Sequence, residues 1–546
     1  MADLLMQMKD LVIEADIDGK WKSIVNGLSL DLHKGEIVGL IGESGAGKST
    51  LGLAAMGYTK PGCRITSGSI RLNQEELVGA SHFRLREIRG NHVSYVAQSA
   101  AAAFNPAHRL IDQFAESPVQ HGKMRPDEAA KRGRELYRQL DLPDPDQIGD
   151  RFPHQVSGGQ LQRAMTAMAM GCDPQLIVFD EPTTALDVTT QIEVLSAIKE
   201  AVRARGVAAI YITHDLAVVA QLADRIMVLR YGDLIEEGNA RELLRDPKQE
   251  YTKRLLEVRS LREHKEGETG QDRILEVTSV TARYPQAAEE VLKDISIEVP
   301  RGKTVAVVGE SGSGKSTLAR VITGLLPPGQ GSVAFQGNRL PPVLRTRSKD
   351  QLRAIQMIYQ MPDVALNPRQ KISEVIGRPL EFYLGLEGEE KHARIAQLLL
   401  QIELPLDYVD RYPGQLSGGE KQRVCIARAL AANPDLIICD EVTSALDQLV
   451  AEGILELLQN LQNELGVSYL FITHDLATVR AIADHIVVMY QGQIVEQGLK
   501  EQILTPPHAP YTELLLSSVP EMDPDWLDVL VERRRRGELP TSASLA

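Results

Sequence analysis

The feature that most constrains this chain is the pattern G-x-x-x-x-G-K-[ST], which occurs twice, at residues 42–49 and 309–316. Each copy follows a short apolar run typical of a buried strand and precedes a stretch with helical character. In this strand–loop–helix setting the glycines let the backbone turn tightly, so that N–H groups converge on nucleotide phosphates. Two copies in the same setting are poorly explained by ordinary glycine-rich turns. The sequence therefore predicts two nucleotide-binding α/β domains.

The residues predicted to contact the nucleotide come first from these two loops. Lys48 and Lys315 are expected to reach the terminal phosphates, and Ser49 and Ser316 are expected to bind Mg²⁺. The full set in the loops is Gly42, Ser44, Gly45, Gly47, Lys48, Ser49, Thr50, Gly309, Ser311, Gly312, Gly314, Lys315, Ser316 and Thr317.

The repeat extends well beyond the phosphate loops. In both halves a glutamine precedes an Asn-Pro pair by seven residues, a Ser-Gly-Gly motif lies 23 residues before an Asp-Glu pair, and a histidine follows that aspartate by 34 residues. These residues are Gln98, Ser157, Gly158, Gly159, Asp180, Glu181 and His214 in the first half, and Gln360, Ser417, Gly418, Gly419, Asp440, Glu441 and His474 in the second. Matching spacings indicate a rigid common frame. The lysine-to-glutamine distances differ, 50 against 45 residues, and this difference is expected in a peripheral loop or helix.

Composition and local patterns limit the remaining possibilities. A net charge of −14 argues against a broad nucleic-acid surface. The sequence contains no run of about 18 apolar residues, so it predicts no membrane-spanning helix. The four cysteines lack C-x-x-C spacing, so zinc sites and disulfide frameworks are not expected. The expected domains are residues 1–257 and 274–531, joined by a charged linker at 258–273 and followed by a basic, disordered tail at 532–546.

Taken together, these motifs closely resemble the ATPase subunits of ABC transporters, and the resemblance covers nearly the whole chain. It implies two tandem ABC-type domains, each with a RecA-like nucleotide-binding core, an antiparallel β part and a helical subdomain. The Asn-Pro pairs and the segments at 246–252 and 507–512 resemble the oligopeptide, dipeptide and nickel importer group. Some members carry a cysteine cluster that holds an iron–sulfur centre. No cysteine lies between Cys172 and Cys425, so no such cluster is expected.

The resemblance also implies a role for each repeated residue. Glu181 and Glu441 are the expected general bases, assisted by His214 and His474 near the γ-phosphate. Asp180 and Asp440, with Gln98 and Gln360, are expected around Mg²⁺, and the glutamines also sense the membrane partner. Each Ser-Gly-Gly motif is expected to bind the ATP held by the other half, with Asp187 and Asp447 linking the two sites. Tyr284 is the expected adenine-stacking residue of the second half. Its counterpart in the first half is Ala15, which leaves Trp21 as the candidate there.

The expected function is ATP hydrolysis that energises import of peptides or related small solutes. The implied partners are two transmembrane permease subunits and an extracytoplasmic solute-binding protein, with no nucleic acid. The chain is expected at the cytoplasmic face of the bacterial inner membrane as a peripheral protein. The alternatives are a tandem ABC ATPase acting on ribosomes, a DNA-repair ATPase and an exporter ATPase. The short mixed-charge linker and acidic composition count against the first, and the lack of zinc or coiled-coil insertions counts against the second.

Overall fold

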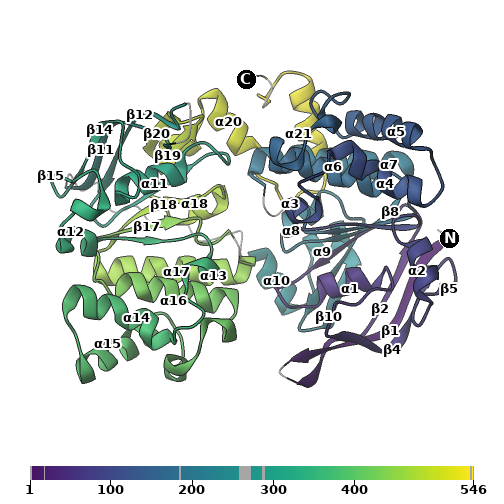
Figure 1. Cartoon of the computed structure of the whole chain (residues 1–546), viewed down its shortest axis with the longest axis horizontal. Helices are drawn as coiled ribbons and strands as arrows, with labels where there is room; N and C mark the ends of the chain where they lie inside the picture. Colours follow the sequence, from purple (N-terminus) through teal and green to yellow (C-terminus); the bar gives the residue numbers. More distant parts are fainter. Residues whose placement is uncertain are drawn as a thin grey trace. The chain divides into compact units, whose positions relative to one another are not determined.

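The computed structural model describes residues 3–17, 19–183, 186–257, 272–285, 289–444, 446–541 and 544. The chain divides into two compact units, one made of Met1–Glu257 with Pro520–Glu538, the other of Val258–Val519 with Leu539–Ala546 (Figure 1). Most of the linker expected at 258–273 lies outside the described residues. No helix among the described residues is long and apolar enough to cross a lipid bilayer.

The first unit contains a four-stranded antiparallel sheet in the order β2-β1-β4-β5 and a six-stranded sheet in the order β10-β9-β3-β8-β7-β6. Its strands are β1 (Leu4–Ile17), β2 (Lys20–His33), β3 (Ile37–Ile41), β4 (Cys63–Leu72), β5 (Glu75–Glu76), β6 (Val93–Val96), β7 (Leu176–Asp180), β8 (Ala208–Ile212), β9 (Arg225–Arg230) and β10 (Asp233–Asn239). Its helices are α1 (Lys48–Ala54), α2 (His82–Ile88), α3 (Ala100–Ala103), α4 (Leu110–Gln120), α5 (Pro126–Gln139), α6 (Gly158–Met170), α7 (Val188–Arg205), α8 (Leu216–Ala220), α9 (Ala240–Arg245), α10 (Glu250–Glu257) and α21 (Trp526–Arg535).

The second unit repeats this topology, with sheets in the orders β12-β11-β14-β15 and β16-β17-β18-β13-β19-β20. Its strands are β11 (Arg273–Ala282), β12 (Leu292–Pro300), β13 (Thr304–Val308), β14 (Gln330–Phe335), β15 (Asn338–Arg339), β16 (Ile355–Ile358), β17 (Leu436–Asp440), β18 (Ser468–Ile472), β19 (His485–Tyr490) and β20 (Gln493–Leu499). Its helices are α11 (Lys315–Thr323), α12 (Lys349–Ala354), α13 (Pro362–Ala365), α14 (Ile372–Pro379), α15 (Gly388–Gln401), α16 (Gly418–Leu430), α17 (Gln448–Leu465), α18 (Leu476–Ile482), α19 (Lys500–Leu504) and α20 (Pro510–Ser517).

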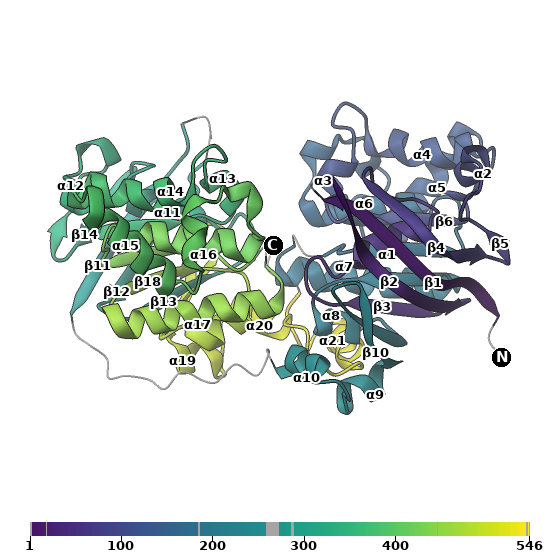
Figure 2. The ribbon, with the colours of Figure 1, turned by 90° about the horizontal axis from the view of Figure 1, so that it is seen from below.

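The six-stranded sheet is the centre of each unit, and its inner strands are buried on both faces, whereas the edge strands β10 and β20 are partly exposed. In β17, Leu436 and Ile438 pack with α11 and the antiparallel sheet, whereas Ile437 and Cys439 pack with α14, α15, α16 and α17. Alternate side chains of a strand point to opposite faces, so a run of consecutive apolar residues suits a sheet covered on both sides. Figure 2 shows the same ribbon turned by 90°, with α16 and α17 lying beside β18. The nucleotide-binding core, antiparallel part and helical part expected from the sequence are all present.

The C-terminal segment differs from the sequence-based boundaries. Residues Pro520–Glu538 belong to the first unit, and α21 spans residue 531, where the second domain was expected to end. Leu527 and Leu530 are buried, and α21 lies beside α7 (Figure 1). The buried amide of Gln221 donates to the carbonyls of Glu521 and Asp523 at 2.6 and 3.0 Å. α21 also extends to Arg535, so residues 532–535, the first part of the tail expected to be disordered, are helical.

Candidate functional site

The two phosphate loops connect a central strand to a helix in the same way in both units, β3 to α1 and β13 to α11. Gly42 has φ 146°, and a Cβ there would lie 2.1 Å from the Leu229 carbonyl oxygen. Gly309 has φ 151°, and its Cβ would lie 2.1 Å from the Met489 carbonyl oxygen. Only glycine fits such positions. Neither α1 nor α11 has a side-chain N-cap, so no side chain competes for the N–H groups at the start of the helix.

The loop lysines are buried against the loops that they follow. Lys48 Nζ donates to the Gly42 and Glu43 carbonyls at 2.7 and 2.9 Å. Lys315 Nζ donates to the Gly309 and Glu310 carbonyls, both at 2.7 Å. A buried ammonium group beside a glycine-rich loop and a helix N-terminus favours an anion, and this arrangement fits the terminal phosphates of a nucleotide.

A tyrosine from a distant segment supports each loop, and the sequence analysis did not identify this role. The N–H of Glu43 donates to the Tyr251 hydroxyl at 3.3 Å, and the N–H of Glu310 donates to the Tyr511 hydroxyl at 2.8 Å. Both tyrosines lie in the segments whose resemblance to the peptide importer group was noted above. The Tyr-Thr pair that both segments contain was the sequence signal from which this role could have been predicted.

The serine–aspartate pairs expected around Mg²⁺ are in contact. Ser49 Oγ donates to Asp180 Oδ1 at 2.8 Å, and Ser316 Oγ donates to Asp440 Oδ1 at 3.0 Å. With its proton directed to the carboxylate, the serine oxygen keeps lone pairs for a cation. Hydroxyl and carboxylate oxygens suit Mg²⁺, so the residues present fit this ion. Burial raises the pKa of Asp440 above its ordinary value, although the Ser316 hydrogen bond opposes the change.

The two glutamates predicted as bases share one arrangement. Gln98 Nε2 donates to Glu181 Oε2 at 2.9 Å, and His214 Nδ1 lies 3.3 Å from Glu181 Oε1. In the second unit Gln360 Nε2 donates to Glu441 Oε2 at 2.6 Å, and His474 Nδ1 lies 3.4 Å from Oε1. The structure thus brings each predicted glutamate, histidine and glutamine together. The role of the glutamines as metal ligands stays a prediction.

The backbone and electrostatics of these glutamates are unusual. Glu181 and Glu441 have φ values of 47° and 50°, in the left-handed region that non-glycine residues seldom occupy. Burial disfavours the charged form of Glu441, but the hydrogen bond and charge of His474 outweigh it and lower the pKa of that carboxyl. Burial likewise disfavours charged His474, but Glu441 raises its pKa above the ordinary value. Glu441 is therefore ionised at neutral pH and suited to accept a proton from water.

The Ser-Gly-Gly motifs form the N-termini of α6 and α16. Ser157 Oγ accepts the N–H of Gln160 at 3.3 Å, and Ser417 Oγ accepts the N–H of Glu420 at 3.4 Å. The Glu420 carboxylate is engaged locally, because it accepts the Ser417 N–H and the Tyr408 hydroxyl proton. A serine cap followed by two glycines leaves the helix N-terminus open to close approach by an anion. The binding of each motif to the other unit's nucleotide stays a prediction.

The remaining predicted residues have local partners. Asp187 and Asp447 cap α7 and α17 by accepting the N–H groups of Thr190 and Val450 at 3.0 and 3.1 Å. Their coupling role and the absence of an iron–sulfur cluster stay predictions.

The two adenine candidates differ in their surroundings. The Tyr284 hydroxyl lies 3.3 Å from Thr317 Oγ1 and accepts a hydrogen bond from Arg320 at 2.9 Å, which places the ring beside α11. Trp21 is 44% exposed, and the Arg64 guanidinium lies 3.9 Å from its ring centroid. The adenine-stacking roles of Tyr284 and Trp21 stay predictions.

Comparison with known proteins agrees with this geometry. The ABC transporter family model matches residues 25–184 and 292–444, and the model described as oligopeptide/dipeptide transporter, C-terminal region, matches 495–544. The chain is 36% identical to the Glutathione import ATP-binding protein GsiA of Salmonella choleraesuis over 95% of this chain and 90% of that protein. It is also 36% identical to the Escherichia coli K12 protein of that name, over 92% of this chain and 87% of that one.

Among solved structures, cbiO1 from Clostridium perfringens is 29% identical with a TM-score of 0.39, covering 43% of this chain and 91% of that one. The family models and the full-length relatives, together with two repeated nucleotide sites, lead to one conclusion: this chain belongs to the ABC transporter family, as an ATPase with two ABC units in one polypeptide.

Proposed function

We propose that this chain hydrolyses ATP to drive import of peptides or related small solutes of the glutathione type. The observation that carries the proposal is the similarity over 95% of the chain to proteins named for glutathione import, together with the oligopeptide/dipeptide transporter match at 495–544. Because both units retain the full set of serine, aspartate, glutamate and histidine contacts, both ATP sites are expected to turn over. These similarities give no support to a role on ribosomes.

In this proposal the chain's own residues position the phosphates and the attacking water. The loop N–H groups and Lys48 or Lys315 bind the phosphates and neutralise their charge. Glu181 or Glu441 accepts a proton from water, and the adjacent histidine holds the carboxylate in its ionised form. Mg²⁺ bound at the serine–aspartate pair would neutralise charge on the β- and γ-phosphate oxygens.

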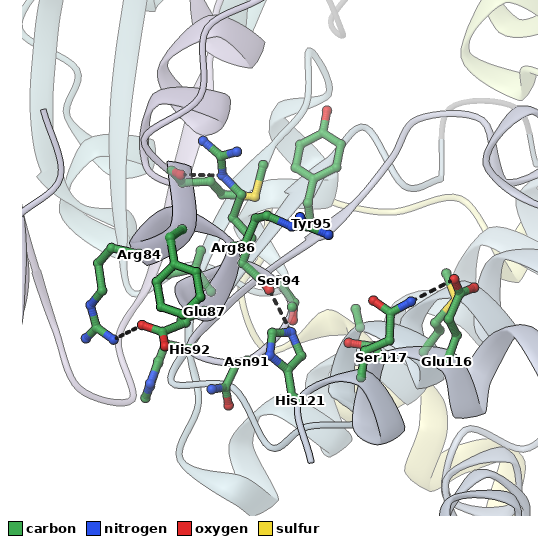
Figure 3. A pocket seen from close by; sticks show the side chains of 18 of the residues that line it. Arg84, Arg86, Glu87, Asn91, His92, Ser94, Tyr95, Glu116, Ser117 and His121 are labelled. Carbon is green, nitrogen blue, oxygen red and sulfur yellow. Dashed lines mark hydrogen bonds and ion pairs between the residues drawn. The ribbon is translucent and has the colours of Figure 1, made fainter. Parts of the chain in front are cut away.

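A groove in the first unit supports the proposal of a membrane partner. It has a volume of about 970 Å³ and is lined by α2, the residues that lead into β6, and the helices α4 and α6 (Figure 3). Phe83, one of the lining residues, is 74% exposed and presents an apolar ring to a partner. The buried atoms Asn91 Oδ1 and Ser94 Oγ on its wall lack a hydrogen-bond partner within the described part of the chain. Exposed apolar surface and unpaired polar atoms together favour a binding surface.

Residues that line the groove account for the unequal distance from lysine to glutamine in the two halves. Four residues, Arg89–His92, separate α2 from β6, whereas α12 runs directly into β16. These residues and one extra residue in α2 account for the difference of 50 against 45 between lysine and glutamine. The extra residues line the groove, as expected for a peripheral insertion. We propose that this groove takes a helical segment of one of two permease subunits, which would hold the chain at the cytoplasmic face of the membrane and work with an extracytoplasmic solute-binding protein.

The test is a pull-down from detergent-solubilised membranes with the Glu181→Gln/Glu441→Gln protein and ATP. Recovery of two polytopic membrane proteins is expected, and a solute-binding protein found with them would lead to the solute. Recovery of ribosomes without membrane proteins would overturn the importer proposal.

A second pull-down tests the groove itself. Phe83→Asp is expected to abolish recovery of one membrane subunit, because a carboxylate replaces the apolar contact. Tyr231→Asp, at a residue that is 69% exposed away from the groove, should leave recovery unchanged. Equal recovery with both variants would exclude the groove as the docking site.

A further inference from the structure

A tyrosine distinguishes the first nucleotide site from the second. Tyr95 on β6 donates its hydroxyl proton to Asp180 Oδ2 at 2.5 Å, while Ser49 donates to Oδ1 of the same carboxylate. β6 runs parallel to β7, with Tyr95 opposite Val178, two residues before Asp180. The tyrosine hydroxyl points away from the wall of the groove formed by Ser117 and His121 (Figure 3). Both oxygens of the first-site aspartate are therefore held by side chains of the same unit.

The second unit has a different residue at this place. Met357 lies three residues before Gln360, as Tyr95 lies three residues before Gln98, and pairs with Ile438 in the same register. A methionine side chain has no proton to donate. Across the described residues, the hydrogen bond from Ser316 is the one side-chain hydrogen bond to the Asp440 carboxylate. The two sites thus share the predicted serine, aspartate, glutamate, glutamine and histidine, and differ in how firmly the aspartate is held.

We infer that Tyr95 is a positioning residue for Mg²⁺ at the first site, and that this site holds metal–nucleotide more tightly than the second. An ionised carboxylate offers about four lone-pair positions on two oxygens. With one hydrogen bond on each oxygen, Asp180 keeps a fixed orientation and still has a lone pair on each oxygen for the ion or its bound water. Asp440 is fixed at one oxygen, so binding of the ion must also order the second.

This inference rests on the proposed role of the serine–aspartate pair in binding Mg²⁺. The test uses the full chain with Lys315→Ala, so that a fluorescent ATP analogue reports the first loop. Binding is measured across a series of Mg²⁺ concentrations and in EDTA. Tyr95→Phe, which removes the hydroxyl alone, is expected to raise the Mg²⁺ concentration at half-saturation roughly tenfold. Affinity for the metal-free analogue should stay unchanged, because the phosphate loop is intact.

Two further variants separate positioning from packing. Met357→Leu in a Lys48→Ala chain alters the matching position of the second unit and should leave Mg²⁺ dependence unchanged. In an Asp180→Asn background, Tyr95→Phe should cause no further shift. The inference would be overturned if Tyr95→Phe left the Mg²⁺ concentration at half-saturation unchanged. It would also be overturned if the variant lost equal affinity for the ATP analogue with and without Mg²⁺. If the parent chain itself shows no Mg²⁺ dependence, the proposed metal site fails first.

Discussion

At the scale of single residues, the chemistry is centred on the glutamate that follows β7 in the first unit and the one that follows β17 in the second. Glu181 and Glu441 each contact a glutamine and a histidine, and each has a left-handed backbone conformation. Such a costly conformation persists where the surrounding structure fixes it.

Removing the carboxylate charge should separate nucleotide binding from hydrolysis. Glu181→Gln/Glu441→Gln is expected to bind ATP normally and to lose roughly 10²–10⁴-fold in hydrolysis, the usual contribution of a general base. Glu420 places a carboxylate in the motif expected to bind the first site's ATP, where the other motif has the neutral Gln160, and the single variants test the hypothesis that this charge slows the first site. Equal residual rates in the two single variants would remove that hypothesis, since Glu420 would then have no measurable effect.

The His474–Glu441 pair should make stability depend on pH. The raised pKa of His474 means that its contribution is complete below about 6.5 and is lost as pH rises through the folded-state value. The lowered pKa of Glu441 means that its contribution is complete above about 4.5 and is lost as pH falls through the folded-state value. The pair therefore stabilises the fold most between these limits.

Thermal unfolding of His474→Ala from pH 5 to pH 9 measures this dependence. The variant should melt about 2–4 °C below the parent protein near pH 6, as for a loss on the order of 1 kcal/mol, and the gap should narrow as pH rises. His108→Ala, at an exposed histidine, is the control. A gap that stays constant with pH would assign the loss to packing instead.

At the scale of elements, the start of α6 shows how two adjacent glycines can have different tasks. A Cβ on Gly159 would lie 2.1 Å from Thr190 Cγ2, in α7, whereas a Cβ on Gly158 would have its nearest neighbour, Leu186 Cδ2, at 3.7 Å. Gly159 therefore allows the helices to approach, while Gly158 lies at the open end of α6.

Alanine substitutions at this pair should separate the two roles. Gly159→Ala is expected to destabilise the first unit by about 1–3 kcal/mol, because Thr190 is stiff and cannot move aside at low cost. Gly158→Ala should change stability by less than about 0.5 kcal/mol. Chemical denaturation measures both. Equal effects of the two substitutions would contradict the close approach of α6 and α7.

At the scale of the whole molecule, the chain leaves the second unit after Val519 and returns to the first at Pro520. Leu527 and Leu530 of α21 are 1% and 4% exposed, Lys199 forms an ion pair of 2.7 Å with Asp528, and the N–H of Leu527 donates to Gln221 Oε1 at 3.0 Å. Buried apolar side chains supply most of the stabilisation in such a contact. The first ABC unit is therefore completed by residues that lie more than 260 positions further along the chain.

Truncation of the buried side chains should weaken the first unit. The double variant Leu527→Ala/Leu530→Ala is expected to lose at most about 2–5 kcal/mol of the free energy of unfolding for each substitution. It should also increase hydrogen exchange in α7 and α8. Val529→Ala, on the same helix but 53% exposed, serves as the matched control. Unchanged exchange in α7 and α8 with the double variant would contradict the assignment of α21 to the first unit.

The sequence alone determined the two phosphate loops, the strands before them, and the serine, aspartate, glutamate, glutamine and histidine that lie together in each unit. Glycine, lysine and apolar runs act through local backbone geometry, and equal spacings in the two halves mark the same rigid frame. Tertiary structure decided the contacts with long separations: Tyr95 on Asp180, Tyr251 on the phosphate loop, and α21 on the first unit. Local patterns carry no information on which distant segment fills a given surface. Such pairings depend on burial and hydrogen bonds that exist only once the sheets and helices have packed.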